Sequence, residues 1–349
     1  MRRLVFITQQ VDPGHPALAA TVPKLAALAS RVDELVVLAD GAVPGVLPAN
    51  CRVRPFRAPG RLGRGLRFEA ALIRELSPRP QAVVAHMCPI YAVLSAPIAR
   101  PLGIRVLLWY THWNATRTLR LAERLVTDVV SVDRRSFPLG SRKVTATGHG
   151  VDLSEHSCRE AGQGEGFRLL GLGRYSPAKG LETVLRGLRL AIDQGLDARL
   201  VLHGPALSAE ERGHRAELDR LVSELGLEAR VRLGHAVLRA ELAPLFQRAD
   251  VLVNNMRAGA PDKAVYEACG SCLPVLASNP SFDDLFAGVE PRLAFKRDSP
   301  NELAARLRAL AALPAEKRAA IGRTLRERAV ASHSVDSWAA GVLAVAEKR

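Results

Sequence analysis

The chain has 349 residues, of which 48% are hydrophobic and 24% charged, and its formal net charge is +14. The length favours two domains that each bury a core, and no apolar run reaches the ~20 residues that a membrane-spanning helix needs. The positive charge favours anionic partners such as phosphate, nucleic acid or acidic lipid, without indicating a fold. Gln9, Gln10 and Asp12 interrupt the first apolar run and no small-residue cleavage site follows. We therefore expect a first β-strand rather than a secretory signal, and a cytoplasmic protein.

The first half of the chain alternates short apolar runs with stretches of helical composition, such as residues 17–30. The apolar runs are continuous rather than alternating, as buried parallel strands require. This βαβ pattern predicts a doubly wound parallel sheet. We expect its strands at residues 3–8, 34–40, 81–87, 104–110, 128–132 and 143–147.

Eight arginines crowd between residues 51 and 80. Only Phe56 and Phe68 lie among them, which is poor material for stacking single-stranded bases, and no nucleic-acid-binding motif is present. One hypothesis is a surface for anionic lipids, with residues 65–76 as an amphipathic helix. The alternative, a solvated surface, is slightly favoured. The arginines are Arg52, Arg54, Arg57, Arg61, Arg64, Arg67, Arg74 and Arg79.

Residues 154–166 are polar, glycine-rich and unpatterned, which indicates a linker. The strand–helix alternation then restarts, with strands expected at residues 167–173, 198–204, 230–234, 249–255, 273–278 and 292–296. The tail from about Pro314 is helical in composition. The predicted domains are therefore residues 1–153 and 167–330, with a C-terminal helix over 331–349 that packs back on the first domain.

The stretch GLGRYSPAKG, residues 171–180, places Arg174 and Lys179 in a turn between a strand and a helix. Ser176 can cap that helix and Pro177 fits its first turn. The N–H groups of a helix N-terminus together with two cations can bind a diphosphate. The alternative, two ordinary surface cations, is equally compatible with this stretch alone.

A second loop, NNMRAGAPD at residues 254–262, is followed by a predicted helix that opens near Asp262 and Lys263. We favour Asp262 as a charge that complements the helix dipole. Lys263 is either a third cation for an anion site or solvated. Glu267 either binds a cis-diol such as ribose or is a carboxylate on the helix surface.

Five cysteines, an odd number in a long chain, argue against a disulfide framework. Cys269 and Cys272 have the spacing of a CxxC pair, but no second pair and no histidine cluster accompanies them. We interpret them as small residues that pack within the structure rather than as metal or redox ligands.

The second half resembles the donor-binding domain of retaining GT-B glycosyltransferases of family 4. The resemblance rests on GLGRYSPAKGLETVLRGL, ARLVLHGP, LGLEARVRLGHAVLRAELAPLFQRADVLV and DKAVYEACGSCLPVLAS, in the family's order and spacing over most of residues 167–285. In the first half, VAHMCPIYAVLSAPIARPLGIRVLLWYTHWN and GHGVDL match more weakly. The resemblance implies a GT-B fold: two doubly wound, Rossmann-like domains facing across a cleft, the first for acceptor and the second for donor.

The resemblance also implies roles for individual residues. Arg174 and Lys179 would bind the donor's diphosphate and stabilise the charge that builds on it, and Glu267 would bind the ribose. His112 would contact the donor sugar, although a histidine packed at a strand end is the alternative. His86 is a weaker candidate for such a contact. Family members transfer a sugar from a nucleotide-sugar to an acceptor hydroxyl with retention, without metal or other cofactor.

Glycines and their neighbours complete the expected site. Gly14 would let the backbone approach donor or acceptor, or simply form a βα turn, and His15 is a weak candidate for an acceptor contact. Backbone from Gly259 to Asp262 would contact the sugar, with Lys263 beside it. The family has two glutamates eight positions apart, and Gly259 stands where the first would be. This departure leaves the sugar undefined.

We therefore expect a metal-independent, retaining hexosyltransferase that uses a nucleotide-sugar and a glycan, lipid or small-molecule acceptor. It would be cytoplasmic, and the stretch from Arg52 to Arg79 would be the route to any anionic membrane surface; no nucleic-acid partner is expected. The alternatives are an epimerase or hydrolase of the same fold and a non-catalytic protein that binds anions or membrane.

Overall fold

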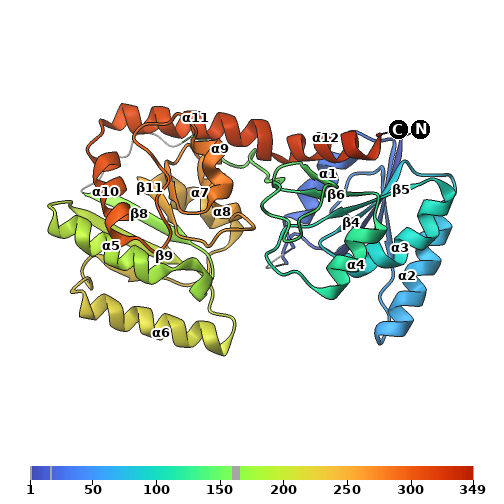
Figure 1. Cartoon of the computed structure of the whole chain (residues 1–349), viewed down its shortest axis with the longest axis horizontal. Coiled ribbons are helices and arrows are strands. Elements are labelled where there is room, and N and C mark those ends of the chain that lie inside the picture. The colour runs from blue at the N-terminus through green and yellow to red at the C-terminus, as the bar shows by residue number, and fades with distance from the viewer. Residues whose placement is uncertain (1, 16–17, 159–165, 349) are drawn as a thin grey trace. The chain divides into compact units, whose positions relative to one another are not determined.

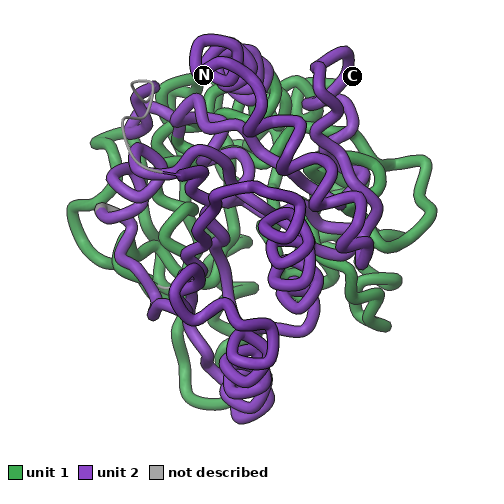
Figure 2. The backbone as a smooth tube through the Cα atoms, turned by 90° about the vertical axis from the view of Figure 1, so that its left-hand side faces the viewer, with its two compact units in different colours: residues 1–152, 332–349 green, residues 153–331 purple. Residues whose placement is uncertain are grey.

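A computed structural model describes residues 2–15, 18–158 and 166–348. The chain divides into two compact units, which Figure 2 shows in different colours. Unit 1 comprises Met1–Asp152 and Ser332–Arg349, and unit 2 comprises Leu153–Ala331. Each unit contains one parallel β-sheet with helices on its faces (Figure 1).

Unit 1 contains a seven-stranded sheet in the order β3-β2-β1-β4-β5-β6-β7. The strands are short and almost wholly buried in the centre of the sheet, which explains their continuous apolar sequences. Their bounds are β1 Arg3–Val11, β2 Glu34–Ala42, β3 Cys51–Pro55, β4 Ala82–His86, β5 Arg105–Trp109, β6 Asp128–Ser131 and β7 Val144–Ala146.

Helices cover both faces of this sheet. Side chains such as Val5 and Ile7 point into a core shared with α2, α3 and α4. On the opposite face, Phe6 and Trp109 contact Trp338 of α12, and α12 packs against α1. The helices are α1 Thr21–Ala29, α2 Arg61–Glu75, α3 Pro89–Ala99, α4 Arg117–Leu125 and α12 Val335–Ala346.

Unit 2 contains a five-stranded parallel sheet in the order β10-β9-β8-β11-β12. The strands are β8 Phe167–Leu172, β9 Ala198–His203, β10 Val231–Leu233, β11 Val251–Asn254 and β12 Val275–Ala277. The helices are α5 Leu181–Asp193, α6 Ala209–Glu224, α7 Arg239–Arg248, α8 Lys263–Gly270, α9 Asp283–Phe286, α10 Pro300–Ala311 and α11 Ala315–His333. Short 3-10 turns lie at Pro177–Lys179 and Pro280–Phe282 in this unit and at Arg100–Leu102 in unit 1. Both units thus have the predicted doubly wound architecture.

Two sequence-based expectations about elements were wrong. Residues 292–296 do not form a strand, because only Ala294 makes a bridge, to Ala277 of β12. Edge strand β3 was not predicted, because its sequence alternates arginine with apolar residues. The described part of the expected linker, residues 154–158, folds against unit 2: His156 is buried and its Nδ1 lies 3.1 Å from the Ser271 hydroxyl. Residues 159–165 of that linker lie outside the described residues.

The expectation about disulfides was also wrong. Cys158 and Cys272 form a disulfide, with their Cα atoms 4.7 Å apart. Only Cys269 behaves as the predicted small packing residue: it is fully buried in α8, and burial raises the pKa of its thiol. None of the helices in the described segments is long and apolar enough to cross a lipid bilayer.

Candidate active site

Two neighbouring strands of unit 2 define a place for ligands. β8 and β11 pair with each other, and from them the chain continues toward opposite edges of the sheet, to β9 on one side and β12 on the other. In open parallel sheets, ligands bind outside the carboxyl ends of strands at such a switch point. The loops after β8 and β11, residues 173–180 and 255–262, are the two that carry the predicted donor-binding residues.

Three contacts connect these two loops. Lys179 Nζ forms an ion pair with Asp262 Oδ2. Asn255 Nδ2 donates to the Gly180 carbonyl at 2.9 Å, and the Arg257 N–H donates to the Ala178 carbonyl at 3.2 Å. The two loops that contain the predicted motifs therefore contact each other at one end of the sheet.

Lys179 is held close to the backbone of its own loop. Its side chain is only 14% exposed, and a Cβ at Gly173, where φ is 127°, would lie 2.4 Å from Lys179 Nζ. Glycine at this position thus leaves the space that the ammonium group occupies. This burial distinguishes Lys179 from an ordinary surface cation.

Asp262 has two roles in the structure. It is the N-cap of α8, where its Oδ1 accepts from the Ala264 N–H at 3.3 Å. Its Oδ2 accepts from Lys179 and, at 2.8 Å, from Asn254 Nδ2. Burial would raise the pKa of Asp262, but the Lys179 ammonium and these hydrogen bonds hold it below its usual value. The favoured interpretation as a helix-start charge is correct, but it is incomplete because the ion pair with Lys179 has no local sequence signature.

Arg174 also has a carboxylate partner. Its Nη2 lies 2.6 Å from Oε1 of the buried Glu211, while the Arg174 side chain as a whole is 56% exposed. Glu211 accepts from the Leu207 N–H at 2.7 Å and from the Ser208 N–H at 3.4 Å in the capping box of α6. Burial opposes its charge, but these N–H groups and Arg174 keep the pKa of Glu211 below its usual value. Glu211 is thus an ionised anchor that orients Arg174.

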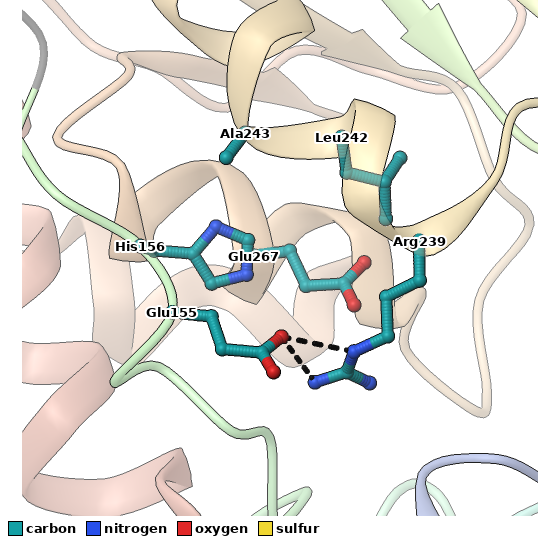
Figure 3. A pocket seen from close by; sticks show the side chains of 6 residues that line it. All are labelled: Glu155, His156, Arg239, Leu242, Ala243 and Glu267. Atoms are coloured by element: carbon teal, nitrogen blue, oxygen red, sulfur yellow. Dashed lines mark hydrogen bonds and ion pairs between the residues drawn. The ribbon is translucent and has the colours of Figure 1, made fainter. Parts of the chain in front are cut away.

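Glu267 lines a pocket of about 390 Å³ rather than the helix surface (Figure 3). It is 4% exposed, which rules out the surface alternative. Lys263 Nζ lies 2.7 Å from its Oε1, one turn away on α8. Lys263 is therefore neither freely solvated nor unpaired; it fixes the Glu267 carboxylate.

Sequence reasoning missed the other side of this pocket. Glu155 and His156 come from the expected linker, and Arg239 from the start of α7. Figure 3 shows the Arg239 guanidinium against the Glu155 carboxylate, 3.0 Å apart, while Leu242 supplies an apolar wall. Glu155 and Arg239 are 84 residues apart, so no local pattern could have connected them.

Gly259 adopts a backbone conformation that explains the missing glutamate. Its φ is 112°, a value that residues with a Cβ rarely adopt. Its carbonyl accepts from Asn279 Nδ2 at 3.3 Å and from the Ser281 hydroxyl at 3.2 Å. This loop conformation is incompatible with an unstrained glutamate at position 259.

The remaining candidates lie in unit 1. His112 follows β5, stacks on Trp113 and accepts from the Asn114 N–H at its Nδ1, at 3.0 Å. The neutral ring therefore carries its proton on Nε2. The Gly14 N–H donates to Asp12 Oδ1 at 2.8 Å within a turn, and the space around Gly14 does not demand a glycine. His15 Nδ1 accepts from the Leu18 N–H at 3.0 Å.

His86 is packed rather than presented to a ligand. It is 5% exposed and stacks on Trp109. Burial, followed by the nearby Lys24 ammonium, lowers the pKa of His86 well below its usual value. A neutral, buried histidine at the end of β4 fits a packing role. Within the described residues, no group of three or more His, Cys, Asp and Glu side chains is arranged to hold a metal ion.

Comparisons with known proteins agree on the fold. A structure of Anabaena HepE in complex with UDP and glucose superposes with a TM-score of 0.75 over 100% of both chains at 18% identity. Sucrose-phosphate synthase from Thermosynechococcus elongatus gives 0.75 over 99% of this chain and 98% of its own at 16% identity. The two units therefore have the GT-B fold, as the sequence resemblance implied.

The sequence of unit 2 also matches a known family. Residues 159–328 match the model of the glycosyl transferases group 1 family. A GDP-mannose:cellobiosyl-diphosphopolyprenol alpha-mannosyltransferase from Xanthomonas campestris is 25% identical over 69% of this chain. The matched region spans about 60% of that relative's length. The corresponding enzyme of Xanthomonas oryzae is 26% identical over 58% of this chain and 53% of its own.

Proposed function

We propose that the protein is a glycosyltransferase that moves a hexose from a nucleoside-diphosphate sugar to an acceptor hydroxyl, with retention and without a metal. The observation that carries this proposal is the contact between the loops after β8 and β11, in which Lys179 pairs with Asp262 at the start of α8. Arg174 lies in the first of these loops and the buried Glu267 in α8, beside a pocket. Two cations and a buried carboxylate suit a ligand with a diphosphate and a ribose. The group 1 family match supports the same class.

The proposed reaction breaks the bond between the sugar C1 and the diphosphate oxygen, and the bonding electrons stay on that oxygen. The acceptor oxygen bonds to C1 on the same face, and its proton passes to the leaving phosphate. Lys179 and Arg174 stabilise the negative charge on this phosphate, most strongly in the transition state. They thereby supply the positive charge that a metal ion would otherwise provide.

The ion pairs at the site constrain how a diphosphate can bind. Arg174, Lys179 and Lys263 each have a carboxylate partner. Lys179 must therefore exchange or share Asp262 with the phosphate. Lys263 keeps Glu267 in place for the ribose hydroxyls. We propose that His112 and the backbone of residues 259–262 contact the donor sugar. Gly14 is proposed to lie near the donor or the acceptor.

GDP-mannose is the proposed donor, because the Xanthomonas relatives use it. At the pocket, the Glu155 carboxylate could accept hydrogen bonds from the N1–H and N2–H₂ groups of guanine, and the Arg239 guanidinium could donate to its O6. A lipid-linked or glycan hydroxyl is the proposed acceptor, and the cytoplasmic side of a membrane the proposed location.

Calorimetric titration of GDP, UDP, ADP and TDP with a chelator present tests the donor site. We expect GDP to bind in the micromolar range and Arg174→Ala to weaken it. Transfer from GDP-mannose should fall roughly a hundredfold in Lys179→Ala, and the anomeric coupling of the product reports retention. Binding of no diphosphate would refute the donor site. Release of sugar without any acceptor would instead indicate a hydrolase.

A further inference from the structure

One wall of the pocket that contains Glu267 comes from residues 154–158, which we call the pocket segment. Glu155 and His156 of this segment line the pocket (Figure 3). The segment forms neither helix nor strand, so no regular hydrogen-bond pattern fixes this wall. Its position depends on the individual contacts that it makes with the rest of unit 2.

A disulfide attaches the pocket segment to the region of α8. Cys158 at the end of the segment is bonded to Cys272, two residues beyond α8, the helix that carries Glu267. The Cys272 end of this bond is rigid. Cys272 is 3% exposed and its N–H donates to the Cys269 carbonyl at 2.9 Å. A Cβ at Gly322 of α11 would collide with the Cys272 carbonyl oxygen. Reduction would therefore free the pocket segment rather than Cys272.

Hydrogen bonds also hold the pocket segment against unit 2. Arg326 Nη1 donates to the His156 carbonyl at 2.6 Å, and Gln247 Nε2 donates to the Ser157 carbonyl at 3.0 Å. His156 Nδ1 lies 3.1 Å from the Ser271 hydroxyl. These bonds would keep the two sulfurs close after reduction, but they constrain the segment less than the covalent link does. The disulfide can therefore re-form.

The two bonded cysteines differ in a way that suits reversible exchange. Cys158 is exposed and Cys272 is buried, so a dithiol would approach from the Cys158 side. Cys272 has a φ of 54°, in the left-handed region that favours glycine. Packing alone does not explain a cysteine there, whereas its bonded sulfur does. The nearby Cys269 is fully buried, and burial raises the pKa of its thiol, so it does not compete in the exchange.

We infer that Cys158 is a site of thiol–disulfide exchange that controls the pocket wall, which is fixed when the bond to Cys272 is closed and loosened when a dithiol reduces it. In the cytoplasm, the proposed location, disulfides are usually transient, catalytic or redox-sensing. The consequence for donor binding rests on the proposed function, but the exchange itself does not.

The exchange is balanced in atoms and electrons. A thiolate of the dithiol attacks the Cys158 Sγ and forms a mixed disulfide. The bond to the Cys272 Sγ breaks with its electron pair on that sulfur, which takes up a proton. The second thiol of the dithiol, once deprotonated, attacks the dithiol's own sulfur in the mixed disulfide. Cys158 leaves as a thiolate and also takes up a proton. The dithiol is thereby oxidised to a disulfide, and the cysteine pair is reduced by two electrons.

Mass mapping and hydrogen–deuterium exchange of the ligand-free full chain test the site. After treatment with oxidised glutathione, peptide masses should show a Cys158–Cys272 link, and N-ethylmaleimide should leave Cys158 unmodified. With dithiothreitol, N-ethylmaleimide should modify Cys158, and the amides of the pocket segment should exchange at least about tenfold faster. Cys158→Ser and Cys272→Gly should exchange at the faster rate in both conditions. The matched control Cys51→Ser removes a free cysteine of β3 and should respond to reduction like the wild type.

Calorimetric titration of GDP in both redox states tests the consequence for the pocket. The oxidised protein should bind GDP about fivefold more tightly than the reduced protein, because Glu155 and His156 need not be ordered on binding. Cys158→Ser should have the weaker affinity in both conditions. Faster exchange on reduction with no GDP binding in either state would refute the donor site and support the exchange site. Modification of Cys158 without reductant, exchange rates that reduction does not change, or equal affinities in a protein that binds GDP would each overturn the inference.

Discussion

The pair between Lys179 and Asp262 makes a prediction about stability and ligand binding together. Asp262→Asn removes the charge but keeps an acceptor for the α8 N-cap. Lys179 Nζ then retains only the Leu172 carbonyl, at 3.4 Å, and neutral groups. Breaking a buried pair costs about 3–5 kcal/mol. Lys179 is 14% exposed and asparagine still offers an oxygen, so we expect the free energy of unfolding to fall by about 1–3 kcal/mol. Each kcal/mol should lower Tm by ~2–4 °C.

The same variant should bind diphosphate more tightly, because phosphate no longer competes with Asp262 for Lys179. Differential scanning calorimetry with and without GDP measures both effects. Relative to the wild type, Asp262→Asn should have a lower Tm without ligand and a larger increase in Tm when GDP is added. Asp250→Asn is a matched control, since Asp250 pairs with Arg168 at 2.9 Å away from the site. It should lose stability without gaining affinity. Unchanged Tm together with unchanged GDP affinity in Asp262→Asn would refute the reasoning.

Acid should remove the difference between wild type and Asp262→Asn. The pKa of Asp262 is lowered in the folded protein, so its charge stabilises the fold above the unfolded value, about 3.9. That contribution is complete at neutral pH and is lost as the pH falls through the lower folded pKa. Urea titrations at pH 7 and below pH 4 should therefore show the two free energies of unfolding converging.

Three further predictions concern the same site. Glu211→Gln removes the anchor of Arg174 and should weaken GDP binding several-fold, by calorimetry, because a mobile guanidinium loses more entropy on binding; equal affinity would contradict this. Glu267→Gln should reduce the preference for GDP over 2′-deoxy-GDP by roughly tenfold, since a charged hydrogen bond contributes about 1.5–3 kcal/mol; an undiminished preference would exclude a ribose role. Gly259→Glu should cost about 1–3 kcal/mol through backbone strain and leave transfer no faster; a stable and faster variant would show that the loop accepts the family's glutamate.

Much of the fold was predictable because buried parallel strands have continuous apolar sequences. One exception was β3, whose arginines are neutralised by Glu34 and Glu75. Such compensation between segments far apart in the chain is absent from any local pattern. The same limit applies to Cys158 and Cys272, which are 114 residues apart.

The position of the two loops was predictable because each follows a strand: Arg174 and Lys179 lie in the loop after β8, and Asp262 in the loop after β11. What the sequence did not reveal was which carboxylate each cation contacts. Those partners decide whether the cations are available to a ligand or already neutralised. The pocket wall from Glu155 and Arg239 was missed for a similar reason, because it forms only when the expected linker folds onto α7.

Unit 1 is assembled from two separate stretches of chain, and this has a consequence for its synthesis. Trp338 of α12 is fully buried against Phe6 and Trp109, so the part of this face of the first sheet that α1 does not cover stays exposed until the ribosome has finished unit 2. At about 5–20 residues per second, this interval lasts roughly 10–35 seconds. During it the nascent chain presents an aromatic surface to chaperones. If translation terminated before α12 was made, that surface would stay exposed even though every strand of the sheet was present.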